Sequence, residues 1–182
     1  MGYFTGKTVW ITGASSGIGE ALALKLSNEG TNLILSARRK EELERVKRAC
    51  SNPDRVVILP LDLEENSKAD QWTTEAWQSF GSIDILVNNG GIGQFGKVLD
   101  THESVERKLF EINYFGNVAL AKSVLPKMIA NGKGQIMAIS SIAGKFGQPN
   151  LAAYSASKGA LTLYYESLKE ELIQAPVKIQ VV

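Results

Sequence analysis

Six short runs of apolar and β-branched residues recur along the chain, each shorter than a typical helix. They cover residues 8–12, 32–37, 55–59, 83–87, 134–140 and 177–182. The runs are rich in Val, Ile and Leu and lack strict alternation with polar residues, which is typical of strands covered on both faces in a parallel sheet. The pattern therefore predicts six buried strands.

Stretches with helical periodicity separate these runs. Between residues 17 and 29 apolar side chains recur three or four positions apart, and Gly30 supplies a C-terminal stop. Further helices are predicted over residues 41–48, 67–80, 101–130 and 155–174. Pro126 is expected to break or bend the longest of them, because proline removes a helical hydrogen bond.

The alternation of strands and helices predicts an α/β fold, doubly wound around a mostly parallel sheet, with right-handed crossovers. Ligands of such folds bind at the carboxyl ends of the strands. The chain has 182 residues, which is enough for one domain with a sizeable core. No repeat or linker is visible, so the predicted domain is residues 1–182.

Composition narrows the class of partner. Twenty Lys and Arg residues face nineteen Asp and Glu, a net charge of +1, and no basic stretch is interleaved with aromatic residues, which argues against nucleic acid. No apolar run approaches the roughly eighteen residues of a membrane-spanning helix. Cys50 and His102 stand alone, too few for a disulfide within the chain or a zinc site. With no leader visible, we expect a cytoplasmic protein.

A glycine-rich loop, TGASSGIG at residues 12–19, joins the first strand to the first helix. Glycines let the backbone approach a phosphate closely, and the helix N-terminus behind them favours negative charge. A plain structural turn is the alternative, because such a loop is weak evidence alone and its spacing departs from G-x-G-x-x-G. The expected cofactor contacts are Gly13, Ser15, Ser16, Gly17, Ile18 and Gly19.

The end of the second strand carries information on the cofactor. An acidic residue there would bind the ribose 2′-hydroxyl of NAD, but this chain has Ala37 followed by Arg38 and Arg39. Guanidinium groups bind a 2′-phosphate by charge-assisted hydrogen bonds. The pattern favours NADP over NAD, against the alternative that both arginines are solvated charges before a helix.

Two further candidates follow the third and fourth strands. Asp62 is placed to accept from an adenine amino group, but its spacing from Glu65 is also that of a helix capping box. Asn88 and Gly90 belong to the sequence NNGG, which forms either a plain turn or a cofactor contact. Its place at a strand's carboxyl end favours the cofactor.

Tyr154 and Lys158 are four residues apart at the start of a predicted helix, so they project from one face. An ammonium group about 4 Å from a phenol favours phenolate by about 4 kcal/mol at an effective dielectric near 20, which brings proton transfer toward neutral pH. Ser141 lies just beyond the fifth strand and is expected to hold a substrate oxygen, with Ser140 as the competing candidate. An isolated Y-x-x-x-K pair would be ordinary helix surface, so its company decides.

Together, TGASSGIG, NNGG, Asn113, ISS ending at Ser141 and YSASK from Tyr154 to Lys158 resemble the short-chain dehydrogenase/reductase family in content and order. SARR and the ELERVK helix resemble an NADP-preferring branch that includes membrane enzymes. The resemblance implies a Rossmann fold and an oxidoreductase that interconverts a carbonyl and an alcohol.

The same resemblance implies roles for single residues. Tyr154 would be the general acid/base, Ser141 would orient the substrate oxygen, Lys158 would also bind the nicotinamide ribose, and Asn113 would support a proton relay. For Asn113 the alternative is an exposed amide in a helix. A homodimer or homotetramer is also implied, in which residues 101–130 pack with the last helix, whose apolar residues are Leu161, Tyr164, Tyr165 and Leu168.

Two departures from the family pattern are visible. Gly90 stands where alanine is commoner, and the lost methyl is expected to loosen the loop slightly. Members of the family also continue past the sixth strand into a segment that covers the substrate, and we expect this chain to lack that segment. A catalytically silent nucleotide-binding or interaction protein is therefore the alternative to an active enzyme.

Overall fold

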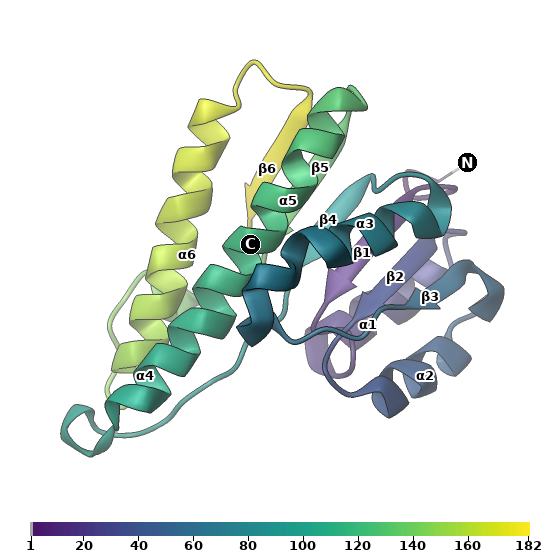
Figure 1. The fold of residues 1–182 in the computed structure, drawn as a ribbon. Coiled ribbons are helices and arrows are strands. Elements are labelled where there is room, and N and C mark those ends of the chain that lie inside the picture. Colours follow the sequence, from purple (N-terminus) through teal and green to yellow (C-terminus); the bar gives the residue numbers. More distant parts are fainter. Residues whose placement is uncertain (1) are drawn as a thin grey trace.

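The computed structural model describes residues 2–182 and contains one six-stranded parallel sheet. The strands lie in the order β3-β2-β1-β4-β5-β6, and Figure 1 shows the sheet between two layers of helices. The strands are β1 Thr8–Thr12, β2 Asn32–Ser36, β3 Val56–Ile58, β4 Ile85–Asn88, β5 Gly134–Ala138 and β6 Val177–Val181. The predicted doubly wound α/β fold is confirmed, with each strand within a few residues of its expected place.

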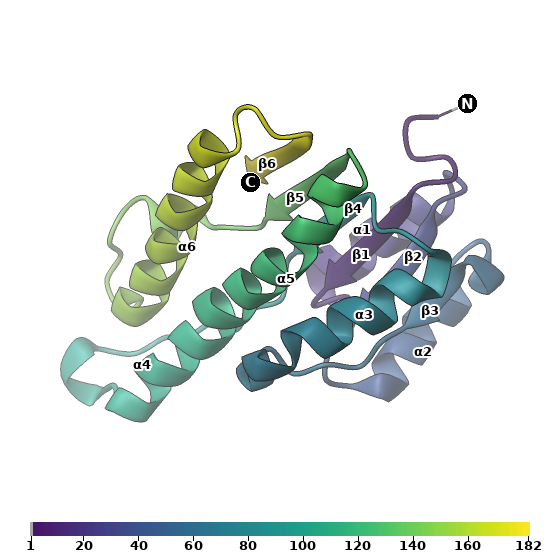
Figure 2. The same ribbon diagram turned by 45° about the horizontal axis from the view of Figure 1, so that its top comes forward.

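Two sets of helices cover the sheet. Helices α1 and α2 lie on one face, and α3, α5 and α6 lie on the other (Figure 2). The helices are α1 Gly17–Ser27, α2 Lys40–Ala49, α3 Ala69–Phe80, α4 Glu103–Phe110, α5 Asn117–Ala130 and α6 Ala152–Glu171, with short 3₁₀ segments η1 Pro53–Arg55, η2 Leu63–Lys68, η3 Val98–Asp100 and η5 Ile142–Gly144. The α3 helix begins two residues later than predicted and α6 begins three residues earlier.

Strand β1 shows why the strands read as continuous apolar runs. Val9 and Ile11 pack with α1 and α2, whereas Trp10 between them packs with the helices of the other face. All three side chains are buried. Because helices cover both faces of the sheet with apolar side chains, neither set of alternating positions along the strand has to be polar.

The two faces are not covered equally. Within residues 2–182 no helix lies over β5 and β6 on the α1 and α2 side of the sheet. Gln135 and Gln180 pair there through an amide hydrogen bond of 3.1 Å, and Met137 is only partly buried. This part of the sheet is therefore the most polar.

The break predicted at Pro126 is wrong, whereas a bend there stays a prediction. Helix α5 continues through Pro126, which lacks the N–H that would bond to the Lys122 carbonyl. Both residues are exposed, so water can satisfy that carbonyl. The departure from α geometry lies earlier, at the π-helix η4, Glu111–Gly116, which joins α4 to α5 in one long rod (Figure 1).

Two classes of site are missing from the part of the chain that the structure describes. None of its helices has both the length and the hydropathy that crossing a membrane requires. Its His, Cys, Asp and Glu side chains form no group of three or more that could hold a metal ion.

Candidate active site

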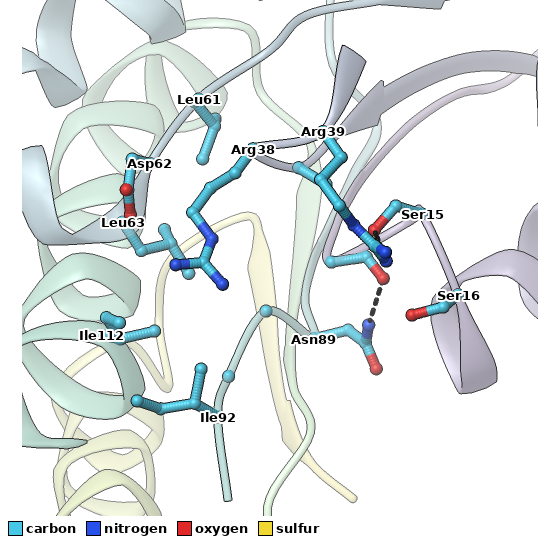
Figure 3. Close-up of a pocket in the computed structure, with 14 residues that line it drawn as sticks. Ser15, Ser16, Arg38, Arg39, Leu61, Asp62, Leu63, Asn89, Ile92 and Ile112 are labelled. Atoms are coloured by element: carbon cyan, nitrogen blue, oxygen red, sulfur yellow. Dashed lines mark hydrogen bonds between the residues drawn. The ribbon is translucent and has the colours of Figure 1, made fainter. Parts of the chain in front are cut away.

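A cleft of about 300 Å³ opens at the carboxyl ends of β1, β2 and β4, where the fold predicts a ligand. Figure 3 shows Arg38 extending into it, between the Leu61–Leu63 segment and the glycine loop. The cleft is lined by Gly13, Ser15, Ser16, Ala37, Arg38, Arg39, Leu61, Asp62, Leu63, Asn89, Gly90, Gly91, Ile92 and Ile112. Its walls combine backbone amides, hydroxyls, two cations and a few apolar side chains.

The glycine loop is shaped by close contacts that leave no room for side chains. Gly13 has a φ of +65°, and a Cβ there would lie 2.8 Å from Gly90 Cα. A Cβ on Gly19 would collide with the Gly13 carbonyl oxygen. Of the six predicted loop contacts, Gly13, Ser15 and Ser16 line the cleft, whereas Gly17, Ile18 and Gly19 form the first turn of α1 behind it.

The two arginines lie at the mouth of the cleft, as predicted, beside Ala37. Among residues 2–182, no carboxylate forms an ion pair with Arg38 or Arg39. Among the residues that the structure describes, the Arg39 guanidinium makes one hydrogen bond, and it is long, 3.5 Å from Nη2 to the Ser15 hydroxyl. Both guanidinium groups therefore keep most of their hydrogen-bonding capacity for a ligand.

Asp62 combines the two roles that the sequence left open. It lines the cleft, and its carboxylate also caps η2 by accepting a hydrogen bond of 3.1 Å from the Glu64 amide. The predicted capping box does not close, because Glu65 pairs with Lys68 instead. One carboxylate oxygen remains for a ligand, and the adenine contact stays a prediction.

Asn88 does not lie where the predicted cofactor contact requires. It is 1% exposed and is absent from the cleft, and its amide donates to Asn117 O at 3.0 Å and to Tyr165 Oη at 2.7 Å. The next residue, Asn89, lines the cleft and donates to the carbonyls of Thr12 and Gly13. Strand alternation could have predicted this difference. Asn88 is two residues after Leu86 and therefore points to the same face of the sheet, the one covered by α3, α5 and α6.

The space beside Gly90 is filled, and the expected loosening of the loop stays a prediction. A Cβ built on Gly90 would lie 2.6 Å from Leu63 Cδ1, so the space of the missing methyl is filled by leucine. The Gly90 amide also donates a hydrogen bond of 2.9 Å to the Thr12 hydroxyl. Packing by Leu63 and this hydrogen bond both restrain the loop at Gly90.

Asn113 is buried, which excludes the alternative of an exposed amide. Its Oδ1 accepts from the Ile92 amide at 2.8 Å, and its Nδ2 donates to the Ile92 carbonyl at 3.0 Å and to Ser157 Oγ at 3.1 Å. A Cβ on Gly91 would lie 3.0 Å from Asn113 Oδ1 and 3.6 Å from Lys158 Nζ. Asn113 and Lys158 therefore converge on the loop after β4, and the proton relay stays a prediction.

Sequence reasoning missed Asn117, which closes a buried network behind this loop. Its Nδ2 donates to the carbonyls of Ile112, Asn113 and Gly90 at 2.9, 3.1 and 3.1 Å. These bonds join the π-helix to the NNGG turn, and Tyr165 adds α6 by donating to the Asn117 carbonyl at 3.1 Å. The sequence signal is the four-residue spacing of Asn113 and Asn117, and this spacing alone does not indicate which groups Asn117 contacts.

The two serines after β5 face different ways. Ser140 Oγ lies 2.6 Å from Thr162 Oγ1 and turns toward α6. Ser141 caps η5, where its Oγ accepts from the Ala143 amide at 3.2 Å and keeps its own proton to donate. Among the described residues, Ser140 Oγ has acceptors in Thr162 Oγ1 and the Lys158 carbonyl, whereas no hydrogen bond donated by Ser141 Oγ is formed.

Tyr154 and Lys158 lie on the first two turns of α6. Lys158 is 5% exposed, and its Nζ donates to the Ile139 carbonyl at 2.8 Å, at the end of β5. Burial lowers the pKa of Lys158 to about 8. Tyr154 is half-buried, and Ser157 donates to its backbone carbonyl at 2.8 Å. A hydroxyl and an amine of the predicted types therefore lie one helical turn apart on α6, which packs against η5, the segment that Ser141 caps.

Solved structures resemble this fold closely. A short-chain dehydrogenase from Streptomyces avermitilis is 35% identical with a TM-score of 0.92, and it matches 97% of this chain and 64% of its own. A metagenomic short-chain oxidoreductase in complex with NADP is 33% identical with a TM-score of 0.90, over 98% of this chain and 81% of that one. A reductase from Burkholderia phymatum in complex with NAD is 27% identical with a TM-score of 0.93, over 100% and 66%.

Curated relatives agree with the structural neighbours. Dehydrogenase/reductase SDR family member 7 from Homo sapiens is 48% identical over 177 residues, which are 94% of this chain and 52% of that protein. A family member 7-like protein from Drosophila melanogaster is 43% identical over 97% of this chain and 56% of its own. The chain thus spans about half the length of these relatives. The family model described as short chain dehydrogenase matches residues 7–182, and the chain belongs to the short-chain dehydrogenase/reductase family.

Proposed function

We propose that the protein is an NADP(H)-dependent oxidoreductase that interconverts a carbonyl and an alcohol. The observation that carries the cofactor choice is the end of β2. Ala37 offers no acceptor to a ribose hydroxyl, whereas Arg38 extends into the cleft and has no carboxylate partner among the described residues. A 2′-phosphate would supply the negatively charged partner that this guanidinium lacks. Because solved relatives bind either NAD or NADP, the choice rests on these residues.

The residues present fit a dinucleotide. Gly13, Ser15 and Ser16 would hold the phosphates at the N-terminus of α1, where the close approach of Gly13 to Gly90 leaves backbone rather than side chain at the cleft wall. Asp62 would accept from the adenine amino group. The bound cofactor would exchange a hydride with the substrate's carbonyl carbon.

The chain's own residues would handle the proton. During reduction Tyr154 gives its phenolic proton to the carbonyl oxygen, and during oxidation it takes the proton from the alcohol. Ser141 donates a hydrogen bond to the same oxygen, using the hydroxyl proton that its cap contact leaves available. Lys158 lies next to Gly91, where it would also bind the ribose.

The cofactor choice is tested by fluorescence titration with NADPH and NADH at one salt concentration. We expect NADPH to bind at least about tenfold more tightly, in line with a charge-assisted pair. Arg38→Ala should remove most of that difference and leave NADH affinity nearly unchanged. Lys40→Ala is the matched control. Lys40 is positively charged and lies two residues after Arg38, as the first residue of α2, but it does not line the cleft. Equal affinities in the unmutated protein would overturn the proposal.

The proposal includes a homodimer or homotetramer, formed through α5 and α6. Leu161 and Tyr165 cannot supply its interface as predicted, because both are 0% exposed and lie in the core. Leu163 on α6 is 65% exposed and Phe115 in η4 is 47% exposed, so these apolar side chains are available instead. Light scattering at tens of micromolar tests this, and a monomer there would contradict it.

A further inference from the structure

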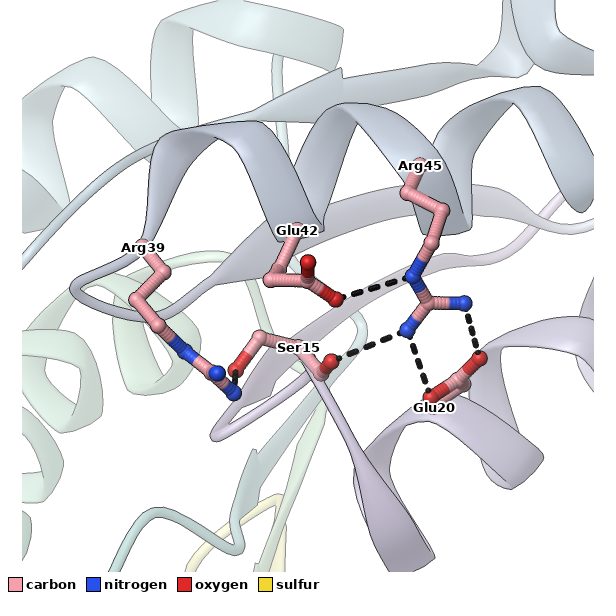
Figure 4. A network of polar contacts seen from close by, with 5 residues as sticks. All are labelled: Ser15, Glu20, Arg39, Glu42 and Arg45. Atoms are coloured by element: carbon pink, nitrogen blue, oxygen red, sulfur yellow. Dashed lines mark hydrogen bonds and ion pairs between the residues drawn. The ribbon is translucent and has the colours of Figure 1, made fainter.

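Arg45 differs from the two arginines of the cleft. Its guanidinium contacts both oxygens of Glu20, at 2.7 and 3.0 Å, and its Nε donates to Glu42 at 2.8 Å (Figure 4). The hydrogen bonds from Arg45 lower the pKa of Glu20, so the pair stays ionised at neutral pH. Two carboxylates thus neutralise Arg45, whereas none within residues 2–182 pairs with Arg38 or Arg39.

The remaining hydrogen bond of Arg45 reaches the glycine loop. Its Nη2 donates to the Ser15 carbonyl at 3.3 Å, while Arg39 reaches the Ser15 hydroxyl from the other side of α2's first turn (Figure 4). Ser15 is 7% exposed and lines the cleft. Ser15 is therefore held by Arg39 and Arg45, which both lie in the segment after β2 that also contains Arg38.

These contacts fix the spacing of two walls. The wall of hydroxyls and amides comes from the loop after β1, and the cationic wall comes from the loop after β2. Neighbouring strands hold the walls at their bases, but the loops themselves extend beyond the sheet. A bidentate ion pair with a second carboxylate in contact is the arrangement in which a surface ion pair holds geometry rather than contributing little.

We propose that Arg45 is a positioning residue for cofactor selectivity, which keeps Ser15 at a fixed distance from Arg38 and Arg39 so that a 2′-phosphate is held from both sides. Arg45 itself does not bind the phosphate, because Glu20 and Glu42 occupy its donors. This inference rests on the proposed NADP preference. It concerns the ratio of NADPH to NADH affinity.

The test uses Arg45→Met, which retains an apolar stem and removes the guanidinium. We expect the ratio of NADPH to NADH affinity to fall by about three- to tenfold, measured by fluorescence titration, since Ser15 would no longer be held opposite Arg38 and Arg39 to contact the 2′-phosphate. Arg48→Met is the matched control: it removes the same charge from the same exposed helix one turn further on. A ratio that falls equally in both variants would reduce the effect to long-range charge and overturn the proposal.

Glu20→Gln separates positioning from direct binding. If Arg45 holds the loop, the amide weakens its anchor, and the affinity ratio falls as in Arg45→Met. If Arg45 is instead a phosphate ligand restrained by Glu20, the freed guanidinium raises NADPH affinity, which would overturn the proposal. Failure of the cofactor assignment is distinguishable, because the unmutated protein would then bind both cofactors equally. A normal ratio in the unmutated protein with no change in Arg45→Met refutes the positioning role alone.

Discussion

Two ends of the same sheet edge are organised by different forces. At the arginine end (Ser15, Arg38, Arg39 and Arg45) exposed cations face the solvent, and ion pairs such as Arg45 with Glu20 set the geometry. At the amide end (Asn88, Asn113, Asn117 and Tyr165) every side chain is at most 1% exposed, and hydrogen bonds set the geometry. The first end should respond to salt and charge, whereas the second should respond to loss of single buried groups.

The largest effect is expected beside the amide end. Tyr154→Phe removes the proton that the proposed reaction transfers, so turnover of a carbonyl substrate should fall by about a thousandfold or more. NADPH affinity should change less than about twofold, because the arginine end is untouched. Tyr3→Phe, at an exposed position, is the control. A phenylalanine variant that retained most of its turnover while chemistry limits the rate would remove Tyr154 from the mechanism.

The next effect is on stability and pH, through Lys158. Its pKa is about 8 in the folded protein, below the usual 10.5, so between these values the unfolded chain binds more protons. The free energy of unfolding therefore rises with pH across that window, by about 1.4 kcal/mol per unit or about 3 kcal/mol in all, and the charge penalty is fully present below pH 8. Urea unfolding at pH 7.5 and 10 should show this rise in the parent and lose it in Lys158→Met. Equal pH dependence in both proteins would refute it.

A direct comparison of the ends comes from one substitution at each. Asn117→Ala leaves three carbonyl oxygens without their amide donor and should lower the free energy of unfolding by about 2 kcal/mol. Arg45→Met should cost under about 1 kcal/mol, because its side chain is 46% exposed. Asn131→Ala, at the exposed end of α5, is the control for asparagine loss. Equal costs at both ends, measured by urea unfolding, would abolish the contrast.

Salt gives the smallest effect. Raising ionic strength from about 0.05 M to about 0.5 M shortens the screening length to a few ångströms. NADPH affinity should then fall about threefold more than NADH affinity, because only NADPH places extra charge beside Arg38 and Arg39. The same titrations measure it, and the unfolding free energy of Asn117→Ala relative to the parent should stay unchanged. A parallel loss for both cofactors would show that the arginines do not select between them.

The sequence predicted what local patterns determine. Strands buried on both faces appear as apolar runs, and the glycine loop, Arg38 and Tyr154 with Lys158 follow from spacing along one element. The difference between Asn88 and Asn89 was missed, although strand alternation contained it. Asn117 was beyond sequence reasoning, because its role depends on carbonyls brought from the NNGG turn 27 residues away. The π-helix was not predicted either, because the only irregularity visible in the sequence was Pro126, which lies at an exposed position where helix α5 continues.

Leu63 restricts which residues can replace two glycines, Gly90 and Gly116. Its Cδ1 occupies the space of a methyl at Gly90, and its backbone carbonyl and Cβ occupy that of a methyl at Gly116. Alanine at Gly90 should therefore be harmful beside leucine but tolerated once Leu63 is shortened to alanine, which a double-mutant cycle of unfolding free energies would reveal as a favourable coupling. At Gly116 no such rescue exists, because the obstructing carbonyl belongs to the backbone. A side chain at Gly90 should therefore be accepted only after Leu63 has been shortened, whereas at Gly116 no substitution of Leu63 makes room for one.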